Sequence, residues 1–81
     1  MNENQIFIKI KQILSKQLSV DIDSIKMESN ISSDLGADSL DTAEIAMVIK
    51  DDFDYDLSDD EMLKIKTVKD IVEILIHKKN T

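Results

Sequence analysis

The sequence predicts an all-α fold: a four-helix bundle with a short third helix and a long loop between the first two helices. Glycine occurs once and proline is absent among the 81 residues, whereas turn-rich β architectures need more of both. Apolar residues recur at helical spacing in several segments, and cap-forming side chains precede them. A chain of this length suffices for one small domain, so residues 1–81 are expected to form a single domain.

The first helix is expected from about Glu3 to Gln17. Its apolar residues recur three or four positions apart, with lysines between them: Ile6, Phe7, Ile10, Ile13, Leu14 and then Leu18. The polar stretch 19–38 that follows is long for a structureless loop, so its isolated apolar residues must hold it against the core. These residues are Val20, Ile22, Ile25, Met27, Ile31 and Leu35.

The second helix is expected to start at Asp38, its N-cap, and to continue to about Phe53. Gly36 allows a sharp turn just before it. Helical geometry places two apolar faces on this segment. The face expected in the core comprises Thr42, Ile45, Ala46, Ile49 and Phe53. The other face comprises Leu40, Ala43 and Met47, and on pattern alone it suits burial under the loop as well as exposure to a partner.

Two shorter signals complete the bundle. Ser58 followed by Glu61 is a capping box that predicts a short third helix. Thr67 is expected to cap a fourth helix with an apolar stripe at spacings of three and one. The residues of that stripe are Val68, Ile71, Val72, Leu75 and Ile76.

Composition and charge exclude several function classes. The absence of cysteine rules out disulfides, thiolate catalysis and cysteine zinc sites. No stretch approaches the roughly 18 apolar residues of a membrane span, and no secretory signal is visible. We therefore expect a cytoplasmic protein, with an organelle matrix as the alternative. The net charge is −7, and positions 28–61 hold twelve acids and one lysine. This surface favours a basic protein partner over nucleic acid.

Metal and catalytic motifs find little support. Asp52, Asp54 and Asp56 alternate as the first ligands of an EF-hand do, but Leu57 stands where glycine is needed and Leu63 where glutamate is needed. His77, the single histidine, lacks metal-ligating neighbours and is expected to be solvated. We expect neither a metal site nor catalytic residues.

Ser39 immediately follows the expected cap of the second helix. The first amides of a helix have no partner inside it, so a phosphate ester on this hydroxyl would lie close to an electropositive helix end. An Asp-Ser pair is also an ordinary helix start. On the residues alone, both interpretations of Ser39 stay open.

The segment DLGADSLDTAEI, residues 34–45, resembles the phosphopantetheine attachment motif of acyl carrier proteins. The similarity continues through FDYDLSDDE and KIKTVKDIVEIL. This resemblance implies a carrier of the fatty-acid type, not an enzyme. A phosphopantetheinyl transferase (a holo-carrier synthase) would attach 4′-phosphopantetheine from coenzyme A to Ser39. Acyl chains would then ride on the arm as thioesters to fatty acid synthesis enzymes and acyltransferases.

The resemblance also implies that the second helix docks onto basic patches of these enzymes, and so favours an open second face. It assigns partner contact to Asp38, Leu40, Asp41, Ala43, Glu44 and Met47. It further implies an acyl chain sheltered between the helices, with candidate lining residues that are equally explained as ordinary core. These are Thr42, Ala46, Ile49, Met62, Ile65, Ile71 and Leu75.

Two departures from the family pattern bear on these assignments. Lys50 interrupts an acidic run and is expected to weaken one contact with a basic partner, while the bulky Met62 and Ile71 are expected to narrow the acyl cavity. Two other functions remain open: a carrier of the same fold for polyketide or aminoacyl groups, and an unmodified acidic interaction domain. In each case we expect a monomer that binds no nucleic acid.

Overall fold

A computed structural model describes residues 2–79 of the chain. It contains four α-helices: α1 (Glu3–Leu18), α2 (Ser39–Phe53), α3 (Asp59–Lys64) and α4 (Val68–Lys79). A short 3-10 helix, η1 (Ile22–Ser24), lies in the long loop between α1 and α2. The described part of the chain has no β-strand. The predicted all-α fold with a short third helix is therefore confirmed, while residues 1, 80 and 81 of the expected single domain lie outside the described residues.

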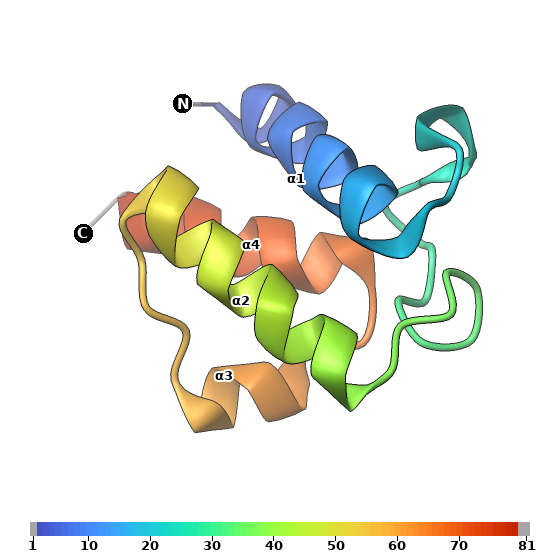
Figure 1. The fold of residues 1–81 in the computed structure, drawn as a ribbon. Coiled ribbons are helices and arrows are strands. Elements are labelled where there is room, and N and C mark those ends of the chain that lie inside the picture. The colour runs from blue at the N-terminus through green and yellow to red at the C-terminus, as the bar shows by residue number, and fades with distance from the viewer. Residues whose placement is uncertain (1, 80–81) are drawn as a thin grey trace.

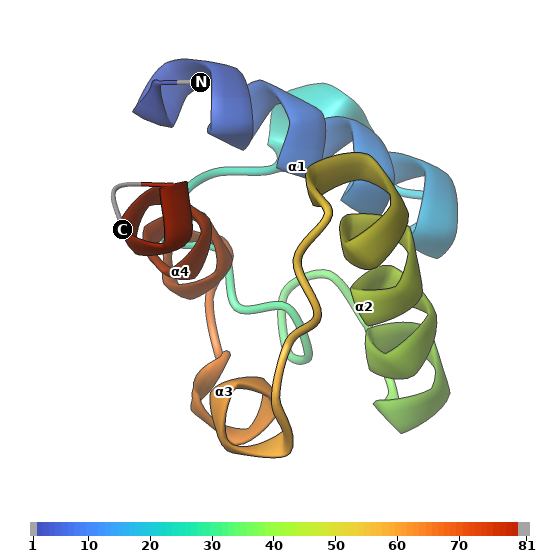
Figure 2. The same ribbon diagram turned by 90° about the vertical axis from the view of Figure 1, so that its left-hand side faces the viewer.

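The helices enclose one core. α1 packs against both α2 and α4, which lie on opposite sides beneath it in Figure 2. Figures 1 and 2 both place α3 at the end of the bundle away from α1. No side chain of α3 is buried, so this helix adds little to the core.

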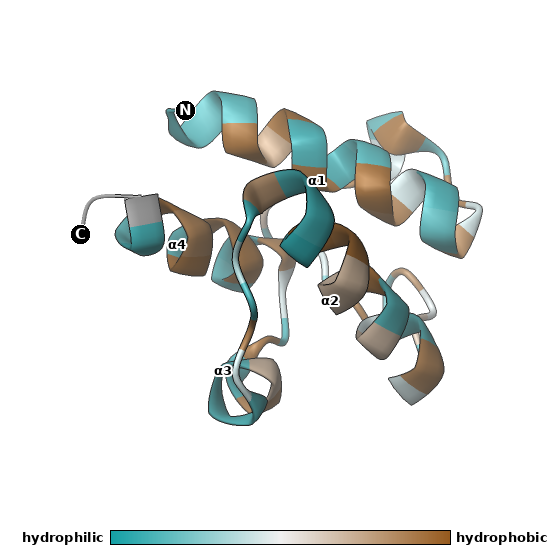
Figure 3. Cartoon of the chain, turned by 60° about the vertical axis from the view of Figure 1, so that its left-hand side comes forward, coloured by the Kyte–Doolittle hydropathy of each residue, from teal (hydrophilic) through white to brown (hydrophobic). Residues whose placement is uncertain are grey.

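The apolar stripes read from the sequence form that core. Figure 3 shows hydrophobic and hydrophilic residues alternating along α1, as an amphipathic helix requires. The side chains with no exposed surface are Ile6, Ile10, Leu14, Ile49, Val68 and Val72. Burying one such aliphatic side chain is worth about 1.5–3 kcal/mol relative to leaving it exposed.

The loop between α1 and α2 is held by apolar side chains, as the sequence predicts. Ile25, Ile31 and Leu35 are buried in the core, and Val20 and Met27 are partly buried against it. The sequence pattern did not reveal η1, whose start is capped by the carboxylate of Asp21 through the amide of Asp23.

Backbone hydrogen bonds also tie this loop to the start of α4. The Ile31 amide donates to the Lys66 carbonyl at 2.9 Å, and the Ile31 carbonyl accepts from the Ala37 amide at 3.0 Å. Two further bonds run from the Val68 and Lys69 amides to carbonyls of the loop. Because Ala37 directly precedes the cap of α2, this relay connects the start of α2 to the start of α4.

Asp70 organises the α4 end of this connection. Its Oδ2 accepts from the amides of Lys66 and Thr67, each at 2.9 Å, and its own amide donates to Thr67 Oγ1 at 3.4 Å. Thr67 therefore caps α4 as predicted. The amide of Thr67, followed by that of Lys66, holds the pKa of the Asp70 carboxyl below its ordinary value of 3.8, although desolvation opposes this shift.

The lowered pKa makes a pH-dependent contribution to stability. A carboxyl whose pKa is depressed on folding stabilises the protein above its unfolded-state pKa, and that stabilisation is lost as the pH falls through the folded-state pKa. We therefore expect Asp70→Asn to lower the free energy of unfolding by about 1–2 kcal/mol near neutral pH. The deficit should shrink as the pH falls below 3.8.

Urea unfolding of both proteins at neutral and acid pH measures this deficit. Asp60→Asn is the matched control, because Asp60 is exposed on α3 and its carboxylate makes no hydrogen bond among residues 2–79. A deficit for Asp70→Asn that is independent of pH would contradict the assignment.

Candidate functional site

The turn that leads into α2 requires a glycine. Gly36 has φ +80°, in the left-handed region, and a Cβ placed on it would meet nothing within 4 Å. The backbone conformation, rather than space, therefore selects glycine here. Its amide donates to the Ser32 carbonyl at 3.0 Å, which folds the chain back just before the helix begins.

A capping box fixes the first turn of α2. Asp38 is the N-cap, and its Oδ1 accepts from the Asp41 amide at 2.8 Å. In return, Asp41 Oδ2 accepts from the Asp38 amide at 3.2 Å. Asp38 is the N-cap, as the sequence predicts, and the helix begins one residue later, at Ser39. Both carboxylates are thus engaged in holding the helix start, and both add negative charge where the helix dipole favours it.

Ser39 is the first helical residue and is exposed. Its hydroxyl takes part in none of the hydrogen bonds described for residues 2–79, and neither do the backbone amides of Ser39 and Leu40. An accessible hydroxyl beside two unpaired amides at a helix N-terminus can accommodate a phosphodiester. The residues present therefore fit a phosphate-linked group attached at Ser39.

The second apolar face of α2 lies open to solvent. Leu40 is 66% exposed and Met47 is 68% exposed, and Ala43 between them is also exposed. Glu44 is exposed beside this stripe, while Asp38 and Asp41 lie at its start. Partner contact by these six residues stays a prediction, and we call them the docking surface after that predicted role: Asp38, Leu40, Asp41, Ala43, Glu44 and Met47. An apolar centre with an acidic rim is typical of a surface that binds a basic partner briefly.

The positive charge of Lys50, next to this surface, is paired with a carboxylate. Its Nζ lies 3.8 Å from Asp56 Oδ2, in the connection between α2 and α3. Because both side chains are exposed, the pair contributes little to stability. Asp56 therefore partly compensates the positive charge of Lys50, the residue that interrupts the acidic segment.

The inner face of α2 is less uniformly buried than the sequence suggests. Ile45, Ile49 and Phe53 are buried as predicted, whereas Thr42 and Ala46 are half-buried. Thr42 lines a hollow of about 190 Å³ together with Ala37 from the preceding turn and Ile65 from the α3–α4 connection. This hollow therefore lies between the start of α2, the loop that precedes it and the α3–α4 connection.

The candidate acyl-pocket residues therefore divide into four that are half-buried and three that are buried. Thr42 and Ile65 line the hollow, and Ala46 and Met62 are half-buried. The remaining three, Ile49, Ile71 and Leu75, are buried in the common core. Their role in sheltering an acyl chain stays a prediction.

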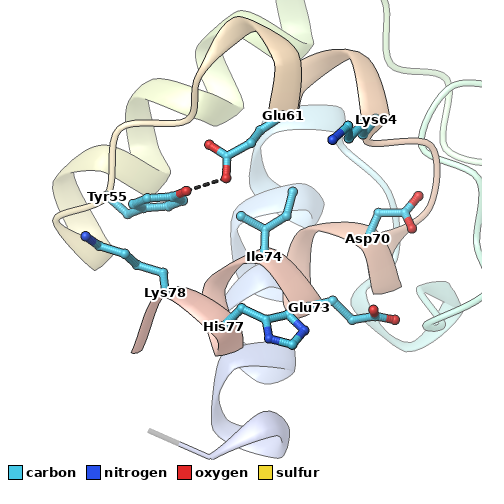
Figure 4. Close-up of a pocket in the computed structure, with 8 residues that line it drawn as sticks. All are labelled: Tyr55, Glu61, Lys64, Asp70, Glu73, Ile74, His77 and Lys78. Carbon is cyan, nitrogen blue, oxygen red and sulfur yellow. Dashed lines mark hydrogen bonds between the residues drawn. The ribbon is translucent and has the colours of Figure 1, made fainter. Parts of the chain in front are cut away.

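A larger hollow, of about 500 Å³, lies between α3, α4 and the preceding connection. Figure 4 shows Ile74 at its centre and the Tyr55 hydroxyl directed at Glu61, to which it donates a hydrogen bond. Glu61 also accepts from the Ser58 amide at 3.0 Å, and this bond, followed by that from Tyr55, lowers the pKa of Glu61. The exposed His77 lines the rim. This hollow contains none of the predicted site residues.

Between residues 2 and 79, no group of three or more histidine or acidic side chains is arranged to hold a metal ion. No helix in the same part of the chain is long and apolar enough to cross a membrane.

Comparison with known proteins decides the family. A family described as the phosphopantetheine attachment site matches residues 9–75. An acyl carrier protein of Picosynechococcus sp. is 51% identical over 78 residues, which cover 96% of this chain and 95% of that protein.

The chain belongs to the acyl carrier protein family.

An acyl carrier protein of Thermosynechococcus vestitus is 38% identical over 78 residues, 96% of each chain. The resemblance noted in the segment DLGADSLDTAEI is thereby confirmed. As a member of this family, the chain is a carrier rather than an enzyme, and its prosthetic group is covalent 4′-phosphopantetheine.

Two contacts of this acyl carrier protein were not foreseen from the sequence. Gln17 Nε2 donates to Glu44 Oε2 at 2.8 Å and so joins the end of α1 to the docking surface. The Tyr55–Glu61 bond joins the connection before α3 to α3 itself. Neither pair stands at a spacing that a single helix would bring together, so only the tertiary arrangement reveals them.

Proposed function

We propose that this protein carries the growing acyl chains of fatty acid synthesis as thioesters on 4′-phosphopantetheine attached to Ser39. The observation that carries the proposal is the exposed Ser39 hydroxyl at the start of α2, beside two unpaired amides. When bound, the prosthetic group supplies the thiol that a chain without cysteine lacks.

The part played by the protein is presentation. The Asp38–Asp41 capping box fixes the first turn of α2, so Ser39 is offered in one orientation. Each carboxylate accepts a hydrogen bond from a backbone amide in this box, which is a structural role. A phosphopantetheinyl transferase that uses coenzyme A, in the cytoplasm, activates the hydroxyl.

The docking surface binds successive enzymes through the same two interactions, electrostatic attraction and apolar contact. Its carboxylates steer cationic patches into contact, and Leu40, Ala43 and Met47 add a small apolar area that holds the complex briefly. Such a surface suits a carrier that must be released after each step. The proposed partners are the transferase, fatty acid synthesis enzymes and acyltransferases that have basic docking patches.

Incubation of the unmodified chain with coenzyme A and a purified phosphopantetheinyl transferase tests the proposal. Intact mass spectrometry should show the addition of one phosphopantetheine group per chain. Proteolysis should place it on the peptide that contains Ser39. A chain that stays unmodified under conditions in which a known carrier is converted would refute the proposal.

Met47→Ala tests the apolar part of the docking surface. Truncating a side chain at the centre of an interface costs on the order of 1 kcal/mol or more, so kcat/KM of the transferase should fall about fivefold. Because Met47 is 68% exposed, the melting temperature should hardly change. Leu63→Ala, on α3 and 80% exposed, is the matched control and should leave kcat/KM unchanged. Equal kcat/KM for both variants would remove Met47 from the surface.

A further inference from the structure

A groove follows the seam between α1 and α2. It has a volume of about 530 Å³ and is lined by Lys9, Gln12, Ile13, Lys16 and Gln17 from α1 and by Val48 and Asp52 from α2. Its apolar lining residues are Ile13 and Val48, and its α1 side also carries two lysines and two glutamines. The groove is distinct from the hollow at Thr42 and from the exposed stripe of α2.

Helical spacing explains the composition of the α1 side. Lys9, Gln12 and Lys16 stand three and then four positions apart, so they share one face over two turns. Lys9 is held over the ring of Phe53, with its Nζ 5.8 Å from the ring centroid. Lys16 is exposed and makes no ion pair or hydrogen bond among the described residues.

The groove adjoins the docking surface. Gln17, at one end of the groove, donates to Glu44 of the docking surface. Val48 follows Met47 directly in the chain and faces the groove, while Met47 faces solvent. A partner that binds the stripe of Leu40 and Met47 would therefore lie close to the groove, with Glu44 between the two surfaces.

The two neighbouring surfaces have opposite charge. The docking surface contains three acidic side chains, Asp38, Asp41 and Glu44, and no base. The groove contains two lysines against the single acid Asp52. Packed helices lie about 8–10 Å apart, so this change of sign occurs over about one helix width.

We propose that partner binding extends into this groove, and that the transferase that loads Ser39 carries an acidic side chain beside its basic patch, placed to meet Lys16. This inference rests on the proposed function. The basic patch faces α2, and the partner carboxylate enters between Gln12 and Lys16. Like-charge juxtaposition penalises the reversed orientation, so the pair of opposite charges fixes how the enzyme is seated.

The direction in which one charge substitution changes kcat/KM of the transferase tests the proposal. If the transferase contacts α2 alone, a more acidic carrier should be modified at an equal or higher rate, because its larger negative charge attracts the basic patch of the enzyme. If a partner carboxylate meets Lys16, Lys16→Glu should lower kcat/KM instead, by about three- to tenfold at low salt. The two accounts therefore predict opposite changes.

Lys26→Glu is the matched control. Lys26 is exposed, its side chain makes no ion pair within residues 2–79, and it does not line the groove. The substitution changes the net charge by the same amount, so kcat/KM should be equal to or above that of the wild type. Thermal melts of both variants exclude a loss of fold as the cause.

The experiment measures phosphopantetheine transfer from coenzyme A by mass spectrometry, with one purified transferase and at two salt concentrations. A kcat/KM for Lys16→Glu that equals or exceeds that for Lys26→Glu overturns the groove proposal. Failure of the wild-type chain to gain the group overturns the proposed function instead, so the two failures are distinguishable.

Discussion

Ser39→Ala is expected to give a folded protein that accepts no phosphopantetheine. The substitution removes the one oxygen to which the group would be joined. It breaks no hydrogen bond described for residues 2–79 and leaves the Asp38–Asp41 capping box in place. Surface substitutions of this kind usually change stability by less than about 0.5 kcal/mol. Modification should therefore be lost completely while the melting temperature stays close to that of the wild type.

Intact mass spectrometry after incubation with the transferase and coenzyme A measures this loss, and circular dichroism reports the fold. Ser33→Ala is the matched control, because Ser33 is exposed in the loop before α2 and its hydroxyl makes no described hydrogen bond. The control should be modified in full. Modification of Ser39→Ala, or loss of modification in Ser33→Ala, would place the attachment elsewhere.

Ile10→Ala should have the largest effect on stability. Ile10 has no exposed surface and lies in α1, the helix that packs against both α2 and α4. Truncating a buried isoleucine to alanine costs about 2–5 kcal/mol, from lost transfer free energy and from the cavity left behind. Small domains have only about 5–15 kcal/mol of stability in total. The variant should therefore be substantially unfolded at moderate urea concentrations that the wild type withstands.

Ile8→Ala separates burial from helix propensity in this experiment. Ile8 lies two positions away on the same helix and is 43% exposed. Both substitutions gain the same helix propensity of alanine, so the difference between their urea midpoints reports packing alone. Equal midpoints would mean that α1 is not the central element of the core.

The sequence predicted the helices well because each carries its own local signals. The N-cap at Asp38, the capping box at Ser58, and the stripes of α1 and α4 depend on residues at most four positions apart. Such signals act within one element and do not need knowledge of the fold. The exposure of Leu40, Ala43 and Met47 was different: periodicity identified a second face, and the family resemblance favoured its being open.

Contacts between elements could not be predicted in the same way. The bond between Gln17 and Glu44 joins residues on different helices, and no local rule pairs a glutamine with a distant glutamate. The half-buried positions of Thr42 and Ala46 depend on how closely α3 and its connection approach α2. The hollow beside Thr42 likewise depends on packing between distant segments, which a helical wheel does not contain.

The backbone relay through Ile31 has a consequence for the order of events during synthesis. The turn before Ser39 is secured through the Ala37–Ile31 bond, and Ile31 is in turn secured by Lys66, which the ribosome delivers much later. A nascent chain that ends before Lys66 contains Ser39 but lacks the backbone partner that holds Ile31 and, through it, the turn before α2. We therefore expect the turn that precedes Ser39 to become ordered only after Lys66 has been added to the chain.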